Sequence, residues 1–378
     1  MDELTSLTRD LVSIPSHDGE AAAGDFLERW LREHTDADVT RDGAGDGSRG
    51  GNVVARRGGD GAADADRTLA LVGHHDVVPP DESQVDDDGG YVVAERGGRL
   101  YGRGTADMKG ADAAMLLAFR DAELPADPSC ELVFASFVGE EVGGVGARAA
   151  IADGFAPDWA LVAEGSTGYS EPGVLDVVVA HKGRRGSTVT ARGSAAHASE
   201  PDAGENAIYR ATDAVDVLRG VDWPTVTVAG EELSGSVVVT EIAGGTALNV
   251  IPERCDVTVD ERTVPGERAD LGAVEAVEGV TWNVDQDLPP MRCSDDAFAD
   301  AVLEAARGAQ DGAGEFVVKP HATDAGWLAA AGTACVVCGP AEQGEAHTAD
   351  ESVRLDVLST CYETYRGLAE TWPQSNHG

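Results

Sequence analysis

Residues 133–141 read VFASFVGEE, an apolar run that ends in two adjacent carboxylates, Glu140 and Glu141. A short run of bulky apolar residues is typical of a buried strand. Water could not solvate carboxylates at the end of such a strand, so a cation or a raised pKa is expected there. The stretch therefore predicts a covered sheet with a polar site at its edge.

Three further segments place polar residues where a strand gives way to a loop. Residues 69–76 read LALVGHHD, residues 102–110 read GRGTADMKG, and the apolar run 159–163 is followed by an acid. The candidates that these segments supply are His74, His75, Asp76, Asp107 and Glu164. Because ligands gather at strand ends in α/β folds, we expect these side chains to meet.

The composition indicates a folded protein with a large negative charge. At 378 residues and 42% hydrophobic content, the chain is long enough for two buried cores. Its net charge of −40 repels nucleic acid and anionic membranes. The acids occur in every segment, which favours the carboxylate shell of a protein working in molar salt over a local acidic tail. With neither a leader pattern nor a long apolar run, we expect a cytoplasmic, halophilic protein.

The pattern along the chain predicts two domains, one of them discontinuous. Strands alternate with helices up to about residue 182, which argues for a mostly parallel, covered α/β sheet. From 183 to 289 alternating strands surround one helix, which indicates a smaller α+β insertion with an antiparallel sheet. Helical patterns then return at 295–309, 324–331 and 353–368. We therefore assign 1–182 and 290–378 to a catalytic domain and 183–289 to an inserted domain.

The candidate residues match the donors of a two-metal site. Zinc takes imidazole nitrogen and carboxylate oxygen, and a catalytic site keeps one position open. The expected metal ligands are His74, Asp107, Glu141, Glu164 and His347. Asp107 can bridge two ions through its two oxygens, and Asp76 can orient the ring of His74. Glu140 remains next to a ligand, placed to take a proton from water.

Several of these residues also have a simpler interpretation. In a chain with 68 acids a glutamate pair is common, and Glu231 and Glu232 form another without an apolar strand before it. Isolated histidines are most often surface residues or satisfied by a neighbour. His74 and His75 are adjacent, and only one can face the metals if the strand alternates. The spacing to Asp76 favours His74.

Five motifs, GHHDVVPP, GRGTADMKG, VGEEVGGVGA, AEGST and GEAHTADES, follow one another along the chain. They resemble the co-catalytic zinc metallopeptidase family that contains acetylornithine deacetylase, succinyl-diaminopimelate desuccinylase, aminoacylase and glutamate carboxypeptidase. The resemblance spans nearly the whole chain and implies two zinc ions, with cobalt or manganese as substitutes, on the five expected ligands. It also implies a cis peptide bond between Asp107 and Met108, Asp76 as orienting acid and Glu140 as general base.

The inserted domain resembles the lid and dimerisation domain of that family. The segment GSAAHASEPDAGENAI is similar to the part whose histidine reaches the partner subunit's active site, which implies a homodimer in which His197 hydrogen-bonds the oxyanion. Asn249 and Arg262 resemble residues that hold the substrate's free carboxylate. Arg262 could instead be an ion-pair partner among the many acids.

We therefore expect a hydrolase that cleaves the amide bond of a small N-acyl amino acid. The motifs look closest to the desuccinylase or the acetylornithine deacetylase, but aminoacylases, dipeptidases and carboxypeptidases share the metal set. Two alternatives from other classes are a non-catalytic metal-binding protein on the same fold and an acidic protein that binds many cations weakly. Neither nucleic acid nor a membrane is an expected partner.

Overall fold

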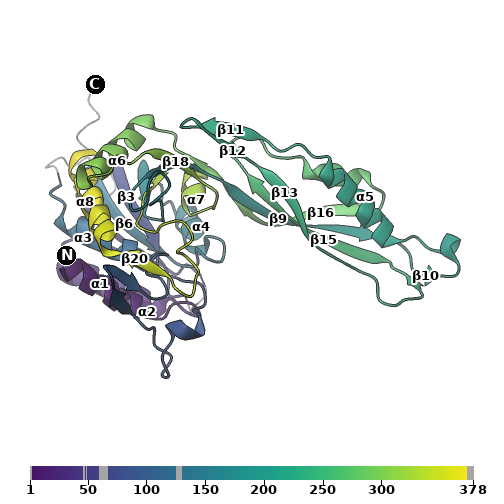
Figure 1. The fold of residues 1–378 in the computed structure, drawn as a ribbon, viewed down its shortest axis with the longest axis horizontal. Coiled ribbons are helices and arrows are strands. Elements are labelled where there is room, and N and C mark those ends of the chain that lie inside the picture. The colour runs from purple at the N-terminus through teal and green to yellow at the C-terminus, as the bar shows by residue number, and fades with distance from the viewer. Residues whose placement is uncertain (1, 46, 48, 59–66, 125–129, 373–378) are drawn as a thin grey trace. The chain divides into compact units, whose positions relative to one another are not determined.

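The computed structural model describes residues 2–45, 47, 49–58, 67–124 and 130–372, and the chain falls into two units (Figure 1). Unit 1 comprises Met1–Ala180, Arg292–Lys319 and Thr323–Gly378, and unit 2 comprises His181–Met291 and Pro320–Ala322. Segments from both ends of the sequence therefore build unit 1.

The main sheet belongs to unit 1. Its strands are β1 (Asp38–Arg41), β2 (Val53–Gly58), β3 (Arg67–His74), β6 (Cys130–Phe137), β7 (Trp159–Val162), β8 (Val177–His181), β17 (Met291–Arg292), β18 (Phe316–Lys319) and β19 (Ala334–Val337). Their order is β1-β2-β6-β3-β7-β19-β8-β17, with β18 paired to β8. Strands β6, β3, β7 and β19 run parallel to their neighbours in the centre, whereas β1 and β2 pair antiparallel at one edge. Every residue of β6 is buried, as expected for a strand covered on both faces.

Helices cover this sheet. They are α1 (Asp2–Val12), α2 (Ala21–His34), α3 (Lys109–Asp121), α4 (Val145–Ala152), α6 (Asp296–Ala309), α7 (Ala325–Ala330) and α8 (Leu355–Thr371). Helix α3 contacts β3 and β6 and packs against α1 and α8, and α6 packs against α8. Helices α4 and α7 contact each other and the strands β6, β7 and β19 (Figure 1). Helical spacing of apolar residues causes this packing, as in α6, where Phe298, Val302 and Ala306 are all buried.

A small antiparallel sheet joins two distant segments of unit 1. It pairs β4 (Ala94–Arg96) with β5 (Arg99–Tyr101), and β5 with β20 (Ser352–Arg354). The short 3-10 helix η1 (Glu82–Gln84) precedes it. The helix expected from residue 353 therefore begins later, at Leu355, because a single buried apolar residue such as Val353 fits a strand as well as a helix.

Unit 2 is an antiparallel sheet with one long helix. The sheet has the order β13 (Ser236–Gly244), β15 (Arg254–Thr263), β9 (Gly183–Arg192) and β16 (Val280–Leu288). Helix α5 (Ala207–Arg219) and the 3-10 helix η3 (Leu271–Ala276) share a buried core with these strands. The remaining elements are β10 (Ala196–His197), β14 (Val250–Ile251), β11 (Thr225–Val228), β12 (Glu231–Ser234) and η2 (Pro201–Ala203).

The fold class expected from the sequence is confirmed. The chain has a large, mostly parallel covered sheet and a smaller antiparallel α+β part. Among the helices in the described part of the chain, none combines the length and the apolar character that crossing a membrane requires.

Candidate metal centre

The glycine-rich turn after β5 presents Asp107. Gly104 has a φ of 85°, and a Cβ at this position would press against Val77, so glycine is the residue that fits. The peptide bond between Asp107 and Met108 is cis. The Asp107 side chain is 12% exposed and lies where the turn meets α3.

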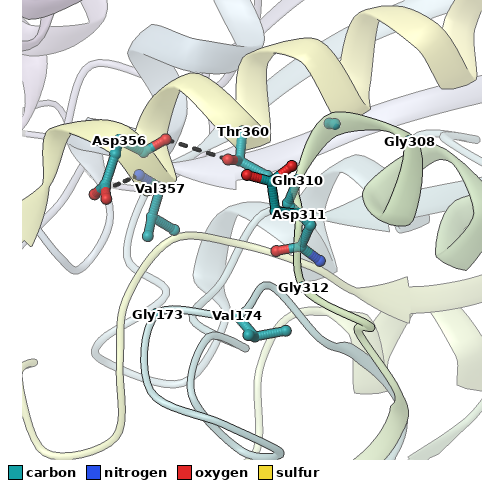
Figure 2. Close-up of a pocket in the computed structure, with 10 residues that line it drawn as sticks. Gly173, Val174, Gly308, Gln310, Asp311, Gly312, Asp356, Val357 and Thr360 are labelled. Atoms are coloured by element: carbon teal, nitrogen blue, oxygen red, sulfur yellow. Dashed lines mark hydrogen bonds between the residues drawn. The ribbon is translucent and has the colours of Figure 1, made fainter.

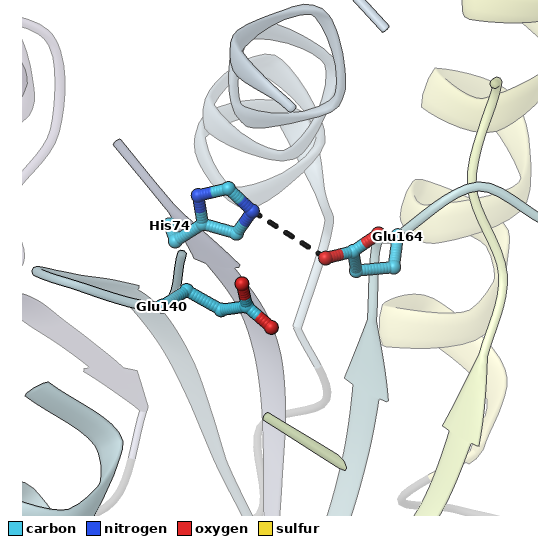
Figure 3. Close-up of side chains that lie close together, drawn as sticks. All are labelled: His74, Glu140 and Glu164. Atoms are coloured by element: carbon cyan, nitrogen blue, oxygen red, sulfur yellow. Dashed lines mark ion pairs between the residues drawn. The ribbon is translucent and has the colours of Figure 1, made fainter. Parts of the chain in front are cut away.

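Three side chains from the ends of different strands form what we call the inner cluster: His74, Glu140 and Glu164 (Figure 3). One ligand atom of each lies within 4.8 Å of the other two. Figure 3 shows His74 facing Glu164, with Nε2 of the ring 3.4 Å from Oε1 of the carboxylate. His74 is 1% exposed and Glu164 is 8% exposed, so this cluster is buried.

Three further side chains form what we call the outer cluster: Asp107, Glu141 and His347. Nε2 of His347 lies 3.0 Å from Oδ2 of Asp107 and 3.0 Å from Oε1 of Glu141. His347 has a φ of 64°, in the left-handed region that few residues other than glycine adopt. Its side chain is 49% exposed, so this cluster borders solvent.

Asp107 joins the two clusters. Its Oδ1 lies 3.0 Å from Nε2 of His74, while its Oδ2 contacts His347. Burial opposes the charge, but hydrogen bonds from His347 and His74 hold the pKa of Asp107 well below its usual range. The ionised carboxylate therefore points one oxygen at each imidazole, which is the arrangement that bridging two cations requires.

Both imidazoles are surrounded by acids. Burial disfavours the charged ring of His74, but hydrogen bonds with the surrounding carboxylates, Asp107 first, outweigh burial and raise its pKa well above the ordinary value. Hydrogen bonds to Asp107 and Glu141 raise the pKa of His347 to about 10. Each cluster therefore favours positive charge.

Asp76 connects the ring of His74 to the turn that carries the two glutamates. Its Oδ1 accepts the backbone N–H of Glu140 at 3.1 Å, and its Oδ2 accepts that of Glu141 at 3.1 Å. The same Oδ1 lies 3.3 Å from Nδ1 of His74, the nitrogen that faces away from the inner cluster. Asp76 can therefore fix the direction of this imidazole and of both glutamates.

Glu140 differs electrostatically from Glu164, the other acid of the inner cluster. Burial raises the pKa of Glu140 well above its ordinary value, although His74 acts in the opposite direction. Glu164, in contrast, has a lowered pKa, because Lys319 and His74 outweigh burial and Asp107. A carboxylate with a raised pKa next to a reaction centre can accept a proton and return it.

His75 points away from both clusters. Its Nδ1 lies 2.9 Å from Oγ of Ser136, and that hydroxyl donates to Asp112 at 3.2 Å. The ring is fully buried, and burial lowers the pKa of His75 to about 3. The structure therefore brings His74, and not His75, to the acids, as alternation at the end of β3 requires.

A buried carboxylate that the sequence did not single out, Glu351, supports the glycine-rich turn. Its Oε1 accepts three backbone N–H groups, those of Gly104, Ala106 and Asp107, at 2.8, 3.0 and 3.3 Å. Its other oxygen pairs with Arg103. Glu351 follows His347 within the motif GEAHTADES, so an inspection of the acids in that motif could have found it.

Two more buried charged residues lie close to the inner cluster. Lys319, the last residue of β18, donates from Nζ to Oε2 of Glu164 at 3.4 Å. Asp324 is 3% exposed, and neither of its carboxylate oxygens has a hydrogen-bond partner within the described residues. Burial raises the pKa of Asp324 to about 7. Both residues lie outside the recognised motifs, which is why the sequence did not indicate them.

The three remaining predicted site residues, His197, Asn249 and Arg262, belong to unit 2. His197 is exposed on β10, and this strand pairs with β14, which begins directly after Asn249. Arg262 donates from Nε to Oδ1 of Asp260 at 2.8 Å. The contact matches the ion-pair alternative for Arg262, and its role in substrate binding stays a prediction.

A separate hollow of about 460 Å³ lies at the start of α8 in unit 1 (Figure 2). In its wall, Oγ1 of Thr360 donates to the carbonyl of Asp356, and the N–H of Val357 donates to the Asp356 carboxylate. These contacts are local to the helix, and none of the lining residues belongs to either cluster. The hollow is therefore not part of the candidate centre.

The donors of both clusters suit divalent transition metals. Each cluster offers one imidazole nitrogen and carboxylate oxygens, the set that zinc takes in proteins. The ligand atoms of each set lie within 4.8 Å of one another, and Asp107 contacts both imidazoles. The residues present therefore fit two divalent cations.

Comparison with known proteins gives a consistent result. The model of a family described as peptidase family M20/M25/M40 matches residues 70–371. An acetylornithine deacetylase from Myxococcus xanthus is 31% identical over 82% of this chain and 81% of its own length. A succinyl-diaminopimelate desuccinylase from Thioalkalivibrio sulfidiphilus is 29% identical over 84% of this chain and 85% of its own. The resemblance expected from the motifs is confirmed.

A solved structure shares the fold along nearly the whole chain. It is a Bacillus subtilis protein described as a dinuclear metal binding peptidase from M20 family. The TM-score is 0.68 at 17% identity, covering 98% of this chain and 97% of that chain. At this identity the likeness concerns the fold.

Proposed function

The chain belongs to peptidase family M20/M25/M40, metal-dependent hydrolases that act on amide bonds, and on that premise we propose that it removes the acyl group of an N-acyl amino acid, with Glu140 as general base. The observation that carries this proposal is the pair of clusters joined by Asp107, with Glu140, whose pKa burial raises, in the inner cluster. His74, Asp107, Glu141, Glu164 and His347 would hold two zinc ions.

The chain's own residues divide the work of hydrolysis. Bound ions would polarise the amide carbonyl and lower the pKa of water. Glu140 would take a proton from the attacking water and deliver it to the leaving amine, which its raised pKa favours. Asp76 would keep Glu140 aimed by holding its backbone N–H. In the proposed homodimer, His197 would serve the active site of the partner subunit, where it would donate a hydrogen bond to the developing oxyanion.

Replacing Glu140 with glutamine tests this role. The variant should lose turnover by about 10²–10⁴-fold, the usual contribution of a general base, while both ions stay bound. Activity on an amide substrate and metal content after dialysis are the two measurements. Glu231→Gln makes the same change at the exposed glutamate pair of β12 and should retain parent activity. A Glu140→Gln enzyme with parent turnover would exclude the proposed base.

The substrate class is proposed to be an N-acyl amino acid with a free carboxylate, held by Asn249 and Arg262. Two relatives act on such compounds by name, and a guanidinium fork suits a carboxylate. A panel of acetyl-ornithine, succinyl-diaminopimelate, other acyl-amino acids and dipeptides would rank the candidates. Each acid should be cleaved faster than its C-terminal carboxamide. Equal rates for acid and carboxamide would remove the carboxylate from the proposal.

A homodimer built through unit 2 is also proposed. Strand β13 lies at the edge of its sheet, with Val238 52% exposed and Ile242 51% exposed. A hollow of about 640 Å³ separates this strand from α5, and both residues line it. An exposed apolar edge strand is a ready surface for a second chain. Sedimentation that finds a fully active monomer would contradict this assembly.

The proposed setting is a cytoplasm rich in salt. The net charge of −40 would cause strong self-repulsion in dilute buffer, and salt screens it. The melting temperature should therefore rise with potassium chloride concentration. A melting temperature that does not respond to salt would contradict this setting.

A further inference from the structure

Lys319 is a buried cation in a place that otherwise collects acids. The chain has three lysines, Lys109, Lys182 and Lys319, and Lys319 is 7% exposed. Lysines are almost never buried without a partner, and Nζ of Lys319 lies 3.4 Å from Oε2 of Glu164. Because Glu164 is a proposed metal ligand, this ammonium is placed to influence how an ion is held.

The two oxygens of Glu164 face different partners. Oε1 lies 3.4 Å from Nε2 of His74 and so faces the inner cluster, whereas Oε2 faces the ammonium of Lys319. Lys319 ends β18, and Glu164 follows β7 by two residues, both in the same sheet. These two strands do not pair directly, because β19 and β8 lie between them in the strand order, so the contact is made by the two side chains.

The ion pair is shielded from solvent. The side chain of Lys319 is 9% exposed and that of Glu164 is 11% exposed. Salt and water therefore screen this contact much less than they screen an ion pair at the surface.

The outer cluster lacks this feature. In the described part of the chain, the ion-pair partner of Glu141 is His347, and neither Lys nor Arg pairs with it. Within the described residues, neither oxygen of Glu141 is therefore held by an ammonium or a guanidinium, and its partner at Oε1 is an imidazole that is itself a proposed ligand. Glu164 and Glu141 therefore differ in how many oxygens they can offer to a metal ion.

We propose that Lys319 is a positioning residue that makes the inner cluster selective for small cations of low coordination number. Because the ammonium holds Oε2, only Oε1 of Glu164 is left to bind a metal ion. One oxygen suits zinc, which is four-coordinate in most protein sites. Cations that prefer about six oxygen ligands, such as manganese, gain more from a carboxylate that binds with both oxygens. The inference rests on the proposed function, because it requires a metal at the inner cluster.

Lys319→Met tests the proposal, since it removes the ammonium and keeps the side-chain length. Metal-free full-length protein would be titrated with Zn²⁺ and with Mn²⁺, following free Mn²⁺ by electron paramagnetic resonance. A His347→Ala background would disable the outer cluster, so that the titration reports the inner one. The ratio of Mn²⁺ affinity to Zn²⁺ affinity should rise about tenfold on replacement of Lys319, within the usual range for groups behind a ligand.

Two variants serve as controls. Lys319→Arg keeps the charge and should keep the parent ratio. Arg32→Met removes a cation from an exposed ion pair with Glu28 on α2, 2.9 Å long, and should also leave the ratio unchanged. If Lys319→Met does not fold, Lys319→Gln, which still donates to Glu164, should shift the ratio in the same direction by a smaller factor.

The outcomes separate the two proposals. An unchanged ratio in the folded neutral variant would overturn the role of Lys319 while leaving the metal site intact. A parent protein that binds neither ion would overturn the proposed function instead. Activity is not needed for either conclusion, because both rest on metal binding.

Discussion

The inner and outer clusters use the same kinds of donor in different surroundings. The side chain of His74 is 2% exposed and has Asp76 behind its ring, whereas the side chain of His347 is 49% exposed. Glu164 shares one oxygen with an ammonium, and Glu141 does not. In metal sites generally, the donors select the class of ion and the residues behind them tune how firmly it is held, and the two clusters differ in this second respect.

Removing Asp107, the carboxylate that contacts both imidazoles, should have the largest effect, because it affects both clusters at once. Asp107→Ala removes the carboxylate that contacts the imidazoles of both clusters, so both ions should be lost. Turnover should fall on the order of a thousandfold or more, since a bound ion supplies several kcal/mol of charge stabilisation. Metal content and amide hydrolysis are the measurements. A variant that keeps one tight ion would show that Asp107 serves a single cluster.

Removing one imidazole at a time should show that the two clusters contribute unequally to the free energy of unfolding. In metal-free protein, His74→Ala leaves buried carboxylates without their partner and should lower the free energy of unfolding by about 3 kcal/mol. His347→Ala removes a half-exposed partner and should cost less than about 1 kcal/mol. Urea unfolding in the presence of a chelator measures both. Equal losses would mean that burial does not distinguish the clusters.

Weakening the support of the glycine-rich turn should affect both clusters alike. Glu351→Gln replaces an acceptor of three backbone N–H groups by an amide and leaves Arg103 without its charged partner. Metal affinity should fall by about 10-fold to 100-fold at both clusters, as for other groups behind metal ligands. Glu342→Gln, on the pair with Arg99, is the matched control. A loss confined to one cluster would show that the turn positions one oxygen only.

Metal affinity at the outer cluster should depend on pH. Its imidazole has a pKa raised to about 10 in the metal-free protein, so an ion must displace a proton at lower pH. Apparent affinity should therefore rise about tenfold per pH unit between roughly pH 6 and 9 and fall as pH decreases. Titration of the His74→Ala variant isolates this cluster. A flat profile would mean that His347 is not a ligand.

Much of the fold could be predicted because its signals are local. The run from Val133 to Phe137 is buried at every residue, as continuous apolar strands in covered sheets are. The helix at 296–309 follows its apolar spacing closely. The short strand Ser352–Arg354 could not be predicted, because its pairing with β5 depends on a partner about 250 residues away in sequence.

In the candidate centre, too, sequence patterns could predict some residues and not others. The residues quoted from motifs, from His74 to His347, come together because each follows a strand or a turn with a recognisable pattern. Glu351 stands within a quoted motif but was not distinguished from the other acids there, whereas Lys319 and Asp324 lie in no motif, and their roles follow only from burial and from what they contact. Spacing in sequence also could not place Arg262, whose contact with Asp260 is a property of the folded strand.

The contact of Glu351 with the glycine-rich turn has a consequence for biosynthesis. A ribosome releases the turn long before it reaches the acceptor, which lies 247 residues beyond Gly104. Until then three N–H groups of the turn have no carboxylate to face, and closing so long a loop is entropically costly. The nascent polypeptide therefore cannot assemble this centre until Glu351 has been made, and a product that stops short of Glu351 would leave the turn without its acceptor.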